Sequence, residues 1–457
     1  MTMHAPIHTH AVILSTGDEL MTGQLQDSNA RWLSEQLVNV GILVAAHAAV
    51  GDDLPDLITV IQHYAARAPL IIISGGLGPT DGDLTREAIC RATNDQLILD
   101  PTSRNDLADK LTRRGRGITP RQERQTFRPS RAAAIANPFG TAPGLHATIA
   151  SEGDWKTTDI LCLPGPPGEL QPMFTRGILP LLRPPTDRLV LTRLLQVIAI
   201  PEADCVQWLG DLTKRDRVPL VGITASGGVL TVRIRYEASE PNTAPGRAAA
   251  TARINTVEAD IRRILGDHVL PNSGTGEESG PEHLAAHTIN ALRDSSVTLR
   301  TLAVVESCTG GMLGQMLTAI PGSSSVFLGG YITYSNTLKQ RLGVRAQTLQ
   351  SLGAVSSETA RELSLCGLRE SATDFALSIT GIAGPDGGSD TKPVGTVHIA
   401  LATKSSGGDP TAHSRHFLFT GNREDIRRRA CVSALAMLHF YLRAHPPGTP
   451  RLLWELG

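Results

Sequence analysis

The sequence has few cysteines and few aromatic residues, and neither sign of charge is in clear excess. Its six cysteines include no C-x-x-C pair, which argues against a zinc site or a disulfide framework and favours a reducing compartment. Aromatic residues make up 4%, and 43 Lys and Arg stand against 44 Asp and Glu, so direct nucleic-acid binding is not expected. No apolar run approaches the roughly 20 residues of a membrane span, and the N-terminal residues lack a signal-peptide pattern. We therefore expect a cytoplasmic protein without a membrane partner.

What the sequence does contain is enough chain and apolar residues for several cores, together with many glycines and prolines. A length of 457 residues suits about three domains at roughly 150 residues each. Short apolar strands alternate with helices in two long segments, which predicts two mostly parallel α/β sandwich domains joined by a small α+β module. The predicted divisions are an α/β domain at 1–180, an α+β module at 185–270, a linker at 271–281, a second α/β domain at 282–445, and a tail outside the core at 446–457.

Strands of the first domain are predicted at 11–15, 42–50 and 70–74, and a helix carries Ala30, Leu33, Leu37 and Val40 on one face. Ligands of parallel sheets bind beyond the carboxyl ends of the strands. Four loops rich in glycine, proline or acidic residues fall in this domain, namely 16–19, 74–85, 137–144 and 163–169. Together they predict one shared pocket for a phosphate-bearing ligand. Asp83 has two interpretations, a helix cap paired with Thr80 or a ligand of a divalent metal.

The middle segment predicts a β-α-β-β-α module. LLQVIAI (194–200) is typical of a strand, 202–212 and 247–265 of helices, and VLTVRIRYE (229–237) alternates apolar and polar residues as a strand with one solvated face does. The arginines of that face are interpreted as solvated rather than as nucleic-acid contacts, because no G-x-x-G loop is present. A spacer or dimerisation element is the role that this architecture suggests.

In the third segment, Ser307 lies between an apolar strand and a glycine-rich helix start. Backbone N–H groups of Thr309, Gly310 and Gly311 follow it and could stabilise an oxyanion. Lys339, after the next strand, could serve as the base if it is buried. The alternatives are that Ser307 caps a helix and that Lys339 is solvated. Cys308 is a rival nucleophile that could equally be a buried apolar residue. Strands are predicted at 301–305, 331–334, 375–380, 394–403 and 416–419, with a packed histidine, His398, in the fourth and a last helix capped by Asn422.

Taken together, these motifs resemble the competence/damage-inducible protein A (CinA) family over nearly the whole chain. The segments that carry the resemblance are TGDELMTGQLQDSNARWL (16–33), GGLGPTDGDLT (75–85), NPFGTAPG (137–144), LPGPPGEL (163–170), IPEADCVQWLGDL (200–212), 304–344, GAVSSETARELS (353–364) and SITGIAGPDGGSDTKPVGTVHIA (378–400). The first four are also similar to molybdopterin-handling proteins, and the fifth to the KH-like middle module of the family.

For the C-terminal domain, the resemblance implies deamidation of nicotinamide mononucleotide to nicotinic acid mononucleotide and ammonia, a step of NAD recycling that needs no cofactor. It implies that Ser307 is the nucleophile and Lys339 the base, with Tyr334 and Thr380 lining the site. Residues implied to meet the substrate are Thr309, Gly310, Gly311, Gly381 and, for its phosphate, Arg423 or Arg427. A homodimer is the assembly that the family implies.

For the N-terminal domain, the resemblance implies a molybdopterin-binding-like fold and, in some members, an ADP-ribose pyrophosphatase that uses a divalent metal (Co²⁺ or Mg²⁺) and K⁺. The chain departs from that pattern, since Gly82-Asp83 replaces two adjacent acidic residues and leaves Asp83 as the candidate metal ligand. The predicted nucleotide pocket consists of Gly17, Asp18, Glu19, Asn29, Gly75, Gly76, Gly78, Thr80, Asp83, Asn137, Gly140 and Gly165. A third reading is a non-catalytic nucleotide- or pterin-binding protein with a role in competence.

Overall fold

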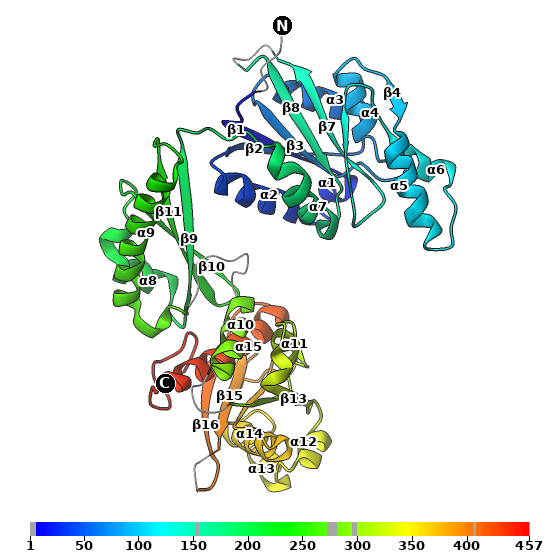
Figure 1. Ribbon diagram of the computed structural model, residues 1–457. Helices are drawn as coiled ribbons and strands as arrows, with labels where there is room; N and C mark the ends of the chain where they lie inside the picture. The colour runs from blue at the N-terminus through cyan, green and yellow to red at the C-terminus, as the bar shows by residue number, and fades with distance from the viewer. Residues whose placement is uncertain (1–5, 152–154, 272–280, 295–298, 405–407, 457) are drawn as a thin grey trace. The chain divides into compact units, whose positions relative to one another are not determined.

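The computed structural model describes residues 6–151, 155–271, 281–294, 299–404 and 408–456, which form two compact units (Figure 1). The first unit is Met1–Leu191 with Glu237–Ala248, and the second is Thr192–Tyr236 with Ala249–Gly457. Most of the predicted middle module therefore shares a unit with the C-terminal segment. Of the predicted linker 271–281, residues 272–280 lie outside the described residues.

The first unit is an α/β sandwich. Its elements are β1 (His10–Thr16), α1 (Asp18–Met21), α2 (Ser28–Asn39), β2 (Leu43–Val50), α3 (Leu54–Ala65), β3 (Leu70–Ser74), α4 (Thr85–Ala92), β4 (Leu97–Leu99), α5 (Pro101–Thr112), α6 (Pro120–Glu123), β5 (Phe127–Pro129), β6 (Ala133–Ile135), β7 (Gly144–Ala150), β8 (Thr157–Leu163) and α7 (Pro167–Met173). The side chain of Asp27 caps α2, because it accepts a hydrogen bond from the Ala30 amide at 2.9 Å.

The main sheet of this unit has the strand order β2-β1-β3-β8-β7-β6. The first four strands run parallel, β7 runs antiparallel to β8, and β6 runs antiparallel to β7, so the prediction of a mostly parallel sheet is confirmed. Along β3, Ile71 and Ile73 pack with α3 and α4, whereas Leu70 and Ile72 pack with α2 and α7 on the other face. This burial on both faces explains why the strand is an unbroken apolar run.

A buried carboxylate lies near the start of β8, where Asp159 is 2% exposed. It accepts hydrogen bonds from His8 at 2.9 Å and His146 at 3.3 Å, and it forms an ion pair with Arg183. Burial alone would raise the pKa of Asp159, but these donors and the guanidinium charge together hold it well below its ordinary value. The ionised form is therefore the one that the folded unit stabilises.

We expect Asp159→Asn to destabilise the first unit by about 3 kcal/mol at pH 7, because it leaves Arg183 without its charge partner. Since the folded pKa is depressed, the stabilisation is present above the unfolded pKa of about 3.9 and is lost as pH falls towards the folded value. Thermal unfolding of both proteins between pH 3 and pH 8 measures this, and the difference between their melting temperatures should shrink as the pH falls below about 3.9. Equal melting temperatures at pH 7 would contradict it, and Asp109→Asn, on an exposed carboxylate of α5, is the control.

The middle module has the predicted β-α-β-β-α order. Its elements are β9 (Leu189–Ile198), α8 (Glu202–Leu209), β10 (Leu220–Ser226), β11 (Val229–Ala238) and α9 (Ala244–Leu265), and the sheet order is β10-β11-β9. Strand β9 begins five residues before the predicted 194, in a half-buried stretch where Arg193 pairs with Glu258 of α9. Ile198 and Val229 belong to the same hydrophobic core as the C-terminal sheet. The module is therefore packed onto the C-terminal domain and is more than a spacer.

The C-terminal part of the second unit is again an α/β sandwich. Its elements are α10 (Pro281–Arg293), β12 (Leu302–Glu306), α11 (Met312–Thr318), β13 (Phe327–Ile332), α12 (Asn336–Leu342), α13 (Ala346–Ser351), α14 (Ser357–Ser371), β14 (Phe375–Gly381), β15 (Thr396–Thr403), β16 (Thr411–Leu418) and α15 (Arg423–Leu442). Asn422 caps α15 in a capping box with Asp425, as predicted for the last helix.

This sheet has the order β13-β12-β14-β15-β16 and is mixed. Strands β13, β12 and β14 run parallel, while β15 and β16 run antiparallel to their neighbours. Helices α10, α11 and α15 cover one face, and α14 covers the other (Figure 1). The α/β class is confirmed, and the antiparallel half of the sheet is the detail that the sequence did not indicate.

Strand β13 differs from its predicted position, since it begins at Phe327 and ends at Ile332, whereas the sequence predicts a strand at 331–334. The sequence pattern does not predict the first half of this strand, because it contains Gly329 and Gly330 and glycine weakens a strand pattern. The register shifts between Leu302 and Ala303 of β12 opposite this stretch. As a result, Thr333 and Tyr334 lie beyond the strand, in the loop that leads to α12.

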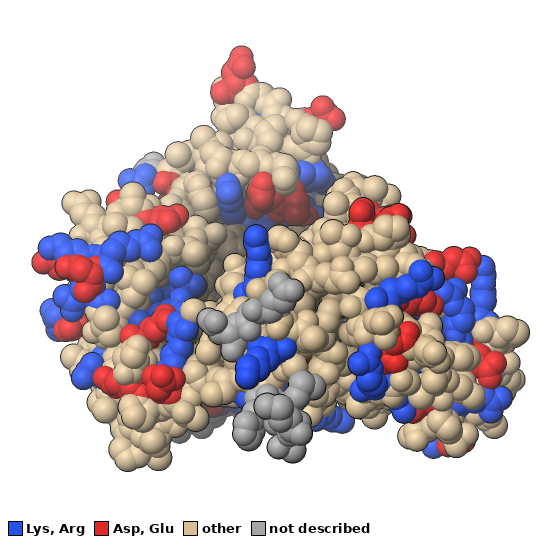
Figure 2. All heavy atoms as spheres, turned by 90° about the horizontal axis from the view of Figure 1, so that it is seen from above, with Lys and Arg blue, Asp and Glu red and all other residues tan. Residues whose placement is uncertain are grey.

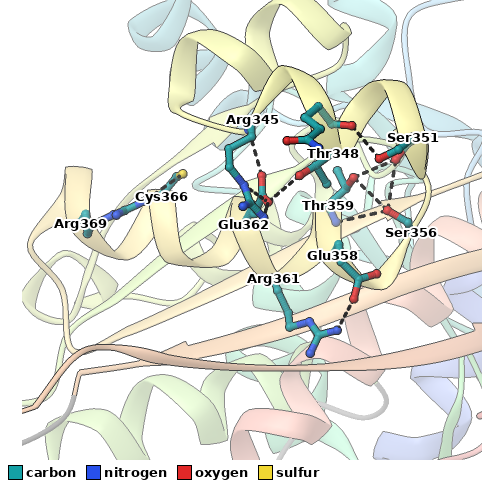
Figure 3. A network of polar contacts seen from close by, with 12 residues as sticks. Arg345, Thr348, Ser351, Ser356, Glu358, Thr359, Arg361, Glu362, Cys366 and Arg369 are labelled. Atoms are coloured by element: carbon teal, nitrogen blue, oxygen red, sulfur yellow. Dashed lines mark hydrogen bonds and ion pairs between the residues drawn. The ribbon is translucent and has the colours of Figure 1, made fainter.

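Helix α13 is fastened to α14 by the carboxylate of Glu362 (Figure 3). It accepts hydrogen bonds from the Arg345 amide at 2.9 Å, from the Arg345 guanidinium at 2.7 Å and from the Thr348 hydroxyl at 2.7 Å. Ser356 caps α14 by accepting from the Thr359 amide at 3.2 Å. These bonds fix the start of α14 and join this helix to α13.

The expectation that residues 446–457 lie outside the core is wrong. Leu452 is buried in the main core of the second unit. Glu455 forms a β-bridge with Phe417 and an ion pair with Arg415, and the Trp454 ring packs against Phe419. The prolines at 446–450 break any periodic pattern, which is why the sequence does not reveal this edge pairing.

The surface carries both signs of charge close together. On the face shown in Figure 2, the blue and red side chains lie interspersed, in agreement with the near-zero net charge. Within the described residues, no helix has the length and apolar character that crossing a membrane would require.

Candidate functional site

Ser307 lies in the turn that joins β12 to α11, at the carboxyl edge of the parallel half of the sheet. Its amide donates to the Ile379 carbonyl of β14 at 2.9 Å, and the residue is largely buried. Helix α11 begins at Met312, and its N-terminal cap is Gly311, which has a φ of +96° that favours glycine. The alternative that Ser307 is the helix cap is therefore wrong.

Lys339 meets Ser307 in a buried contact. It lies on α12, whose start is capped by Ser335, and it is 1% exposed. Its Nζ is 3.0 Å from Ser307 Oγ and donates to the Thr333 carbonyl at 2.7 Å. The alternative that Lys339 is a solvated helix residue is wrong, and the predicted pair of nucleophile and base is brought together.

The surroundings of Lys339 favour its neutral form. Burial lowers the pKa of its ammonium group, and within the described residues no carboxylate forms an ion pair with it. Burial also raises the pKa of the neighbouring Cys308 thiol to about 12, so that thiol stays protonated near neutral pH. Of the two interpretations of Cys308, a rival nucleophile or a buried apolar residue, the structure favours the second. Ser307 is left as the candidate nucleophile.

Two of the backbone amides that were predicted to stabilise an oxyanion, those of Gly310 and Gly311, have other partners in the structure. The Gly310 amide donates to the Ser307 carbonyl at 3.1 Å, and the Gly311 amide donates to the Glu306 carboxylate at 3.0 Å. Both are thus engaged within the turn and cannot serve as free oxyanion donors in this conformation. Within the described part of the chain, the amides of Cys308 and Thr309 donate to no other residue, and the Cys308 amide lies against its own thiol, so these two are the candidate donors of the turn.

Two buried hydroxyl groups lie beside the pair, one on Thr309, which the sequence analysis names, and one on Thr333, which it missed. Thr309 Oγ1 and Thr333 Oγ1 are both buried, and within the described residues neither has a hydrogen-bond partner. Thr309 lies two positions after Ser307, and the Thr333 carbonyl accepts from Lys339. Unpaired buried hydroxyls are uncommon because they cost free energy, so they are candidate contacts for a ligand. Thr333 could have been found only by knowing that the strand ends at Ile332.

Tyr334, Arg423 and Arg427 lie at the edge of this site. Tyr334 is 60% exposed, and its hydroxyl accepts from the Arg423 guanidinium at 3.1 Å, while Arg423 also donates to the Gly384 carbonyl. Arg427 donates to the Thr309 carbonyl at 2.7 Å, so it directly holds the turn that follows Ser307. Arg427 therefore lies against the turn that follows Ser307, whereas Arg423 lies beside Tyr334.

Thr380 and Gly381 are near the site but are used by the fold. Thr380 is buried, and its hydroxyl donates to the Ala354 carbonyl at 2.7 Å, on the side of the sheet that α14 covers. A Cβ on Gly381 would lie 2.6 Å from Val397 Cγ2, so glycine is required there for strand packing. His398, which pairs with Thr380 across β14 and β15, is packed as predicted, and burial lowers its pKa to about 4.

In the first unit, the predicted pocket loops do converge at the carboxyl edge of the parallel strands. Asn29 of α2 donates to the Ser74 hydroxyl at 2.9 Å and to the Gly165 carbonyl at 2.7 Å, which joins the second and fourth loops. A Cβ on Gly75, whose φ is +105°, would lie 2.7 Å from the Thr16 carbonyl oxygen, so the first and second loops touch there. Only glycine allows this approach.

The third loop is tied to the fourth. Asn137 donates to the Glu169 carboxylate at 2.7 Å, and a Cβ on Gly140 would come within 1.9 Å of the same carboxylate. The convergence of four loops that the sequence predicts is thus borne out by these contacts.

An arginine that the sequence did not single out holds the second loop. Arg86 is 1% exposed and donates to the carbonyls of Leu77 and Gly78, each at 2.7 Å. Gly76, with a φ of +66°, would place a Cβ 2.2 Å from the Thr85 hydroxyl. The buried guanidinium of Arg86 therefore holds the loop through the carbonyls of Leu77 and Gly78.

Asp83 braces this loop and does not cap a helix. Its carboxylate accepts from the Gly78 amide at 2.7 Å, from the Thr80 amide at 2.7 Å and from the Thr80 hydroxyl at 2.5 Å. Helix α4 begins two residues later at Thr85, after Leu84 in the cap position. The capping-box interpretation is wrong because the turn that Thr80 and Asp83 close is not continued by a helix.

The first loop folds against the end of β2. The Gly17 amide donates to the Val50 carbonyl at 3.1 Å, and Asp18 accepts from the Asp52 amide at 3.0 Å. A Cβ on Gly17 would lie 2.5 Å from Glu19 Oε1. The two acidic residues of this loop are thus gathered near Asp52.

These residues do not fit a metal ion in the arrangement described. Burial, together with the charges of Asp18, Glu19 and Asp83, raises the pKa of Asp52. The Asp52 carboxylate occupies the space that a side chain at position 82 would need, since a Cβ on Gly82 would lie 2.7 Å from Asp52 Oδ2. Among the described residues, however, no three His, Cys, Asp or Glu side chains come together as metal ligands. Both carboxylate oxygens of Asp83 are moreover hydrogen-bonded within its loop.

Three family models match the chain. The model described as "CinA C-terminal domain" matches residues 282–442, "Probable molybdopterin binding domain" matches 12–184, and "Damage-inducible protein CinA KH domain" matches 192–270. Among solved structures, the competence/damage inducible protein CihA from Agrobacterium tumefaciens is 37% identical, with a TM-score of 0.33, and covers 37% of this chain and 99% of its own. The molybdopterin biosynthesis enzyme MoaB from Thermus thermophilus is 25% identical, with a TM-score of 0.26, over 38% of this chain and 91% of its own.

Relatives of full length are also found. A CinA-like protein of Anaeromyxobacter sp. (strain Fw109-5) is 37% identical over 440 residues, which are 95% of this chain and 99% of the relative. A protein of Symbiobacterium thermophilum whose name describes it as competence-damage inducible is 37% identical over 441 residues, 94% of this chain and 98% of its own. Because relatives at this identity span nearly the whole length, the chain belongs to the CinA family.

Proposed function

We propose that the C-terminal domain is a serine amidohydrolase that deamidates nicotinamide mononucleotide to nicotinic acid mononucleotide and ammonia. The observation that carries the proposal is the 3.0 Å contact between Lys339 Nζ and Ser307 Oγ in a buried setting. A buried amine without a carboxylate partner is a base that can take the serine proton near neutral pH. The choice of substrate rests on the family resemblance of the motifs around these two residues.

The reaction divides into two transfers at Ser307. In the first, Lys339 takes the hydroxyl proton while Oγ bonds to the carboxamide carbon, and the oxyanion that forms is held by the Cys308 and Thr309 amides. The C–N bond then breaks, and the Lys339 ammonium group returns the proton to the departing nitrogen, which leaves as ammonia. In the second transfer, Lys339 takes a proton from water, whose oxygen attacks the acyl-enzyme ester. The bond between Ser307 Oγ and the acyl carbon then breaks, the Lys339 ammonium group returns the proton to Ser307 Oγ, and the carboxylic acid product leaves.

Substrate binding is proposed to use the arginines at the start of α15. Arg423 and Arg427 are the cations at the site edge, and a phosphate fits a forked guanidinium well. We leave both as candidates for the phosphate contact. The exposed ring of Tyr334, held by Arg423, would cover the nucleotide from the same side.

The test is to incubate the full chain with nicotinamide mononucleotide, without added metal, and to measure ammonia and nicotinic acid mononucleotide together. We expect both products in equal amounts. Nicotinamide, the free base, is the comparison substrate and should be a much poorer one if the arginines bind the phosphate. Absence of ammonia from the mononucleotide would contradict the proposal.

The other functions that the resemblance implies stay predictions. An ADP-ribose pyrophosphatase in the first unit needs a metal that the described acidic residues do not fit, so no step is derived for it. The converging loops support a pocket for a nucleotide or pterin there, whether or not it is catalytic. The homodimer likewise stays a prediction.

A further inference from the structure

Glu306, the residue before Ser307, is a buried carboxylate to which neither the sequence analysis nor the proposed reaction gives a role. It is 1% exposed and ends strand β12. Its side chain accepts three amide hydrogen bonds, from Gly311 at 3.0 Å, Leu313 at 3.1 Å and Gly314 at 2.8 Å. All three amides belong to the start of α11, so the carboxylate fastens the end of the strand to the beginning of the next helix.

The main chain of Glu306 holds the other half of the catalytic pair. Its carbonyl accepts from the Thr333 amide at 2.8 Å, and the Thr333 carbonyl in turn accepts from Lys339 Nζ at 2.7 Å. One residue therefore connects the turn that carries Ser307 with the loop that orients Lys339. No Lys or Arg forms an ion pair with Glu306 among the described residues, so its charge is stabilised by the three amides and by the positive end of the short helix.

The Glu306 carboxylate also determines which backbone amides of the turn remain available to stabilise an oxyanion. If it were absent, the Gly311 amide would point unpaired into the turn and would compete for the oxyanion or reorient the glycines. With it in place, the Gly311 amide is engaged, and those of Cys308 and Thr309 remain as donors. Preorganised donors of this kind lower the barrier because they need no rearrangement when charge develops.

We propose that Glu306 is a positioning residue that fixes the catalytic turn and thereby selects the Cys308 and Thr309 amides as the oxyanion donors. This inference rests on the proposed amide hydrolysis. It assigns to Glu306 no proton transfer and no contact with substrate. Its effect should therefore be seen in the rate of chemistry and not in substrate binding.

The test compares Glu306→Gln and Glu306→Asp with the full-length wild-type chain. Glutamine keeps one oxygen acceptor but turns an NH₂ group towards amide donors, whereas aspartate keeps the charge on a shorter stem. We expect Glu306→Gln to lower kcat for ammonia release about 100-fold, close to the loss of one oxyanion donor, with KM changed less than threefold. Glu306→Asp should recover part of that loss. The pH at which activity rises should stay the same, because the side chain does not touch Lys339 Nζ.

A matched control is Glu362→Gln, since Glu362 is also a partly buried carboxylate that accepts an amide hydrogen bond, but it fastens α13 to α14 (Figure 3). It should lower the melting temperature and leave kcat near that of the wild type. A purely structural role for Glu306 would give the same pattern, a lower melting temperature with kcat within threefold of wild type at a temperature where the protein is folded. That result would overturn the inference.

A second readout separates this inference from the proposed substrate. A fluorophosphonate probe reacts with an activated serine whatever its natural substrate, and intact mass with peptide mapping locates the adduct. We expect labelling at Ser307 in the wild type and about 100-fold slower labelling in Glu306→Gln. If the wild type is labelled but releases no ammonia, the proposed substrate fails, and the relative labelling rates still decide the role of Glu306. If the wild type is not labelled at Ser307, both proposals are overturned.

Discussion

Replacing Ser307 by alanine is expected to lower kcat for ammonia release by on the order of 10³-fold or more, the loss typical of removing a nucleophile. The variant removes only Oγ, which contacts Lys339 Nζ at 3.0 Å, and Lys339 keeps its acceptor at the Thr333 carbonyl. Folding should therefore be little affected, and binding of nicotinamide mononucleotide, followed by calorimetry, should persist. An acyl-enzyme that accumulates in the wild type and is detected by intact mass should be absent from the variant.

The control for this variant is Ser364→Ala, which removes a buried hydroxyl that donates to the Arg361 carbonyl within α14, away from the catalytic turn. It should keep kcat within a few-fold. If Ser307→Ala retained full activity, the nucleophile would have to be sought elsewhere, although the Cys308 thiol, with its pKa raised to about 12 by burial, is a poor substitute. Loss of binding together with loss of turnover would instead indicate that the turn had collapsed.

Much of the fold could be predicted because local patterns and tertiary burial agree. Buried strands such as 70–74 and 375–380 are short apolar runs bounded by turn residues, and the helix starts after Asp27 and Asn422 carry side chains that cap them in the structure. The sequence did not predict features that depend on contacts between residues far apart in the chain. The pairing of Glu455 beside Phe417 is one of them, because nothing local distinguishes that stretch from a solvated tail.

The contact between Ser307 and Lys339 could be predicted for a geometric reason. Ser307 and Lys339 are 32 positions apart, but they follow adjacent parallel strands, β12 and β13, whose carboxyl ends meet at one edge of the sheet. What the sequence could not indicate is the direction in which a polar side chain turns. Glu306 and Asp83 both turn onto backbone amides of their own loops, and Thr380 turns its hydroxyl onto the Ala354 carbonyl, on the face of the sheet that α14 covers.

Replacing Lys339 by methionine is expected to lower kcat/KM by roughly 10²–10⁴-fold, the contribution typical of a positioned general base. The folded protein should be at least as stable as the wild type, because methionine fills the same buried space without an amine that has to be desolvated. Loss of activity with a retained or higher melting temperature is the combined signature, and it separates a catalytic effect from misfolding. Lys339→Arg, which cannot lose its proton near neutral pH, should be inactive as well.

The pH dependence gives the sharper form of this prediction. Burial lowers the pKa of Lys339 below its ordinary value of about 10.4, and the neutral amine is the active form, so kcat/KM of the wild type should rise with pH through that lowered pKa and then level off. Because the unfolded chain binds the proton that the buried amine gives up, the stability of the wild type should also rise with pH. The excess melting temperature of Lys339→Met should then shrink as pH approaches about 10.4. Arg341→Met, on the exposed side of the same helix, should leave both curves unchanged. If Lys339→Met kept the rising limb of the wild-type profile, the base would be another group.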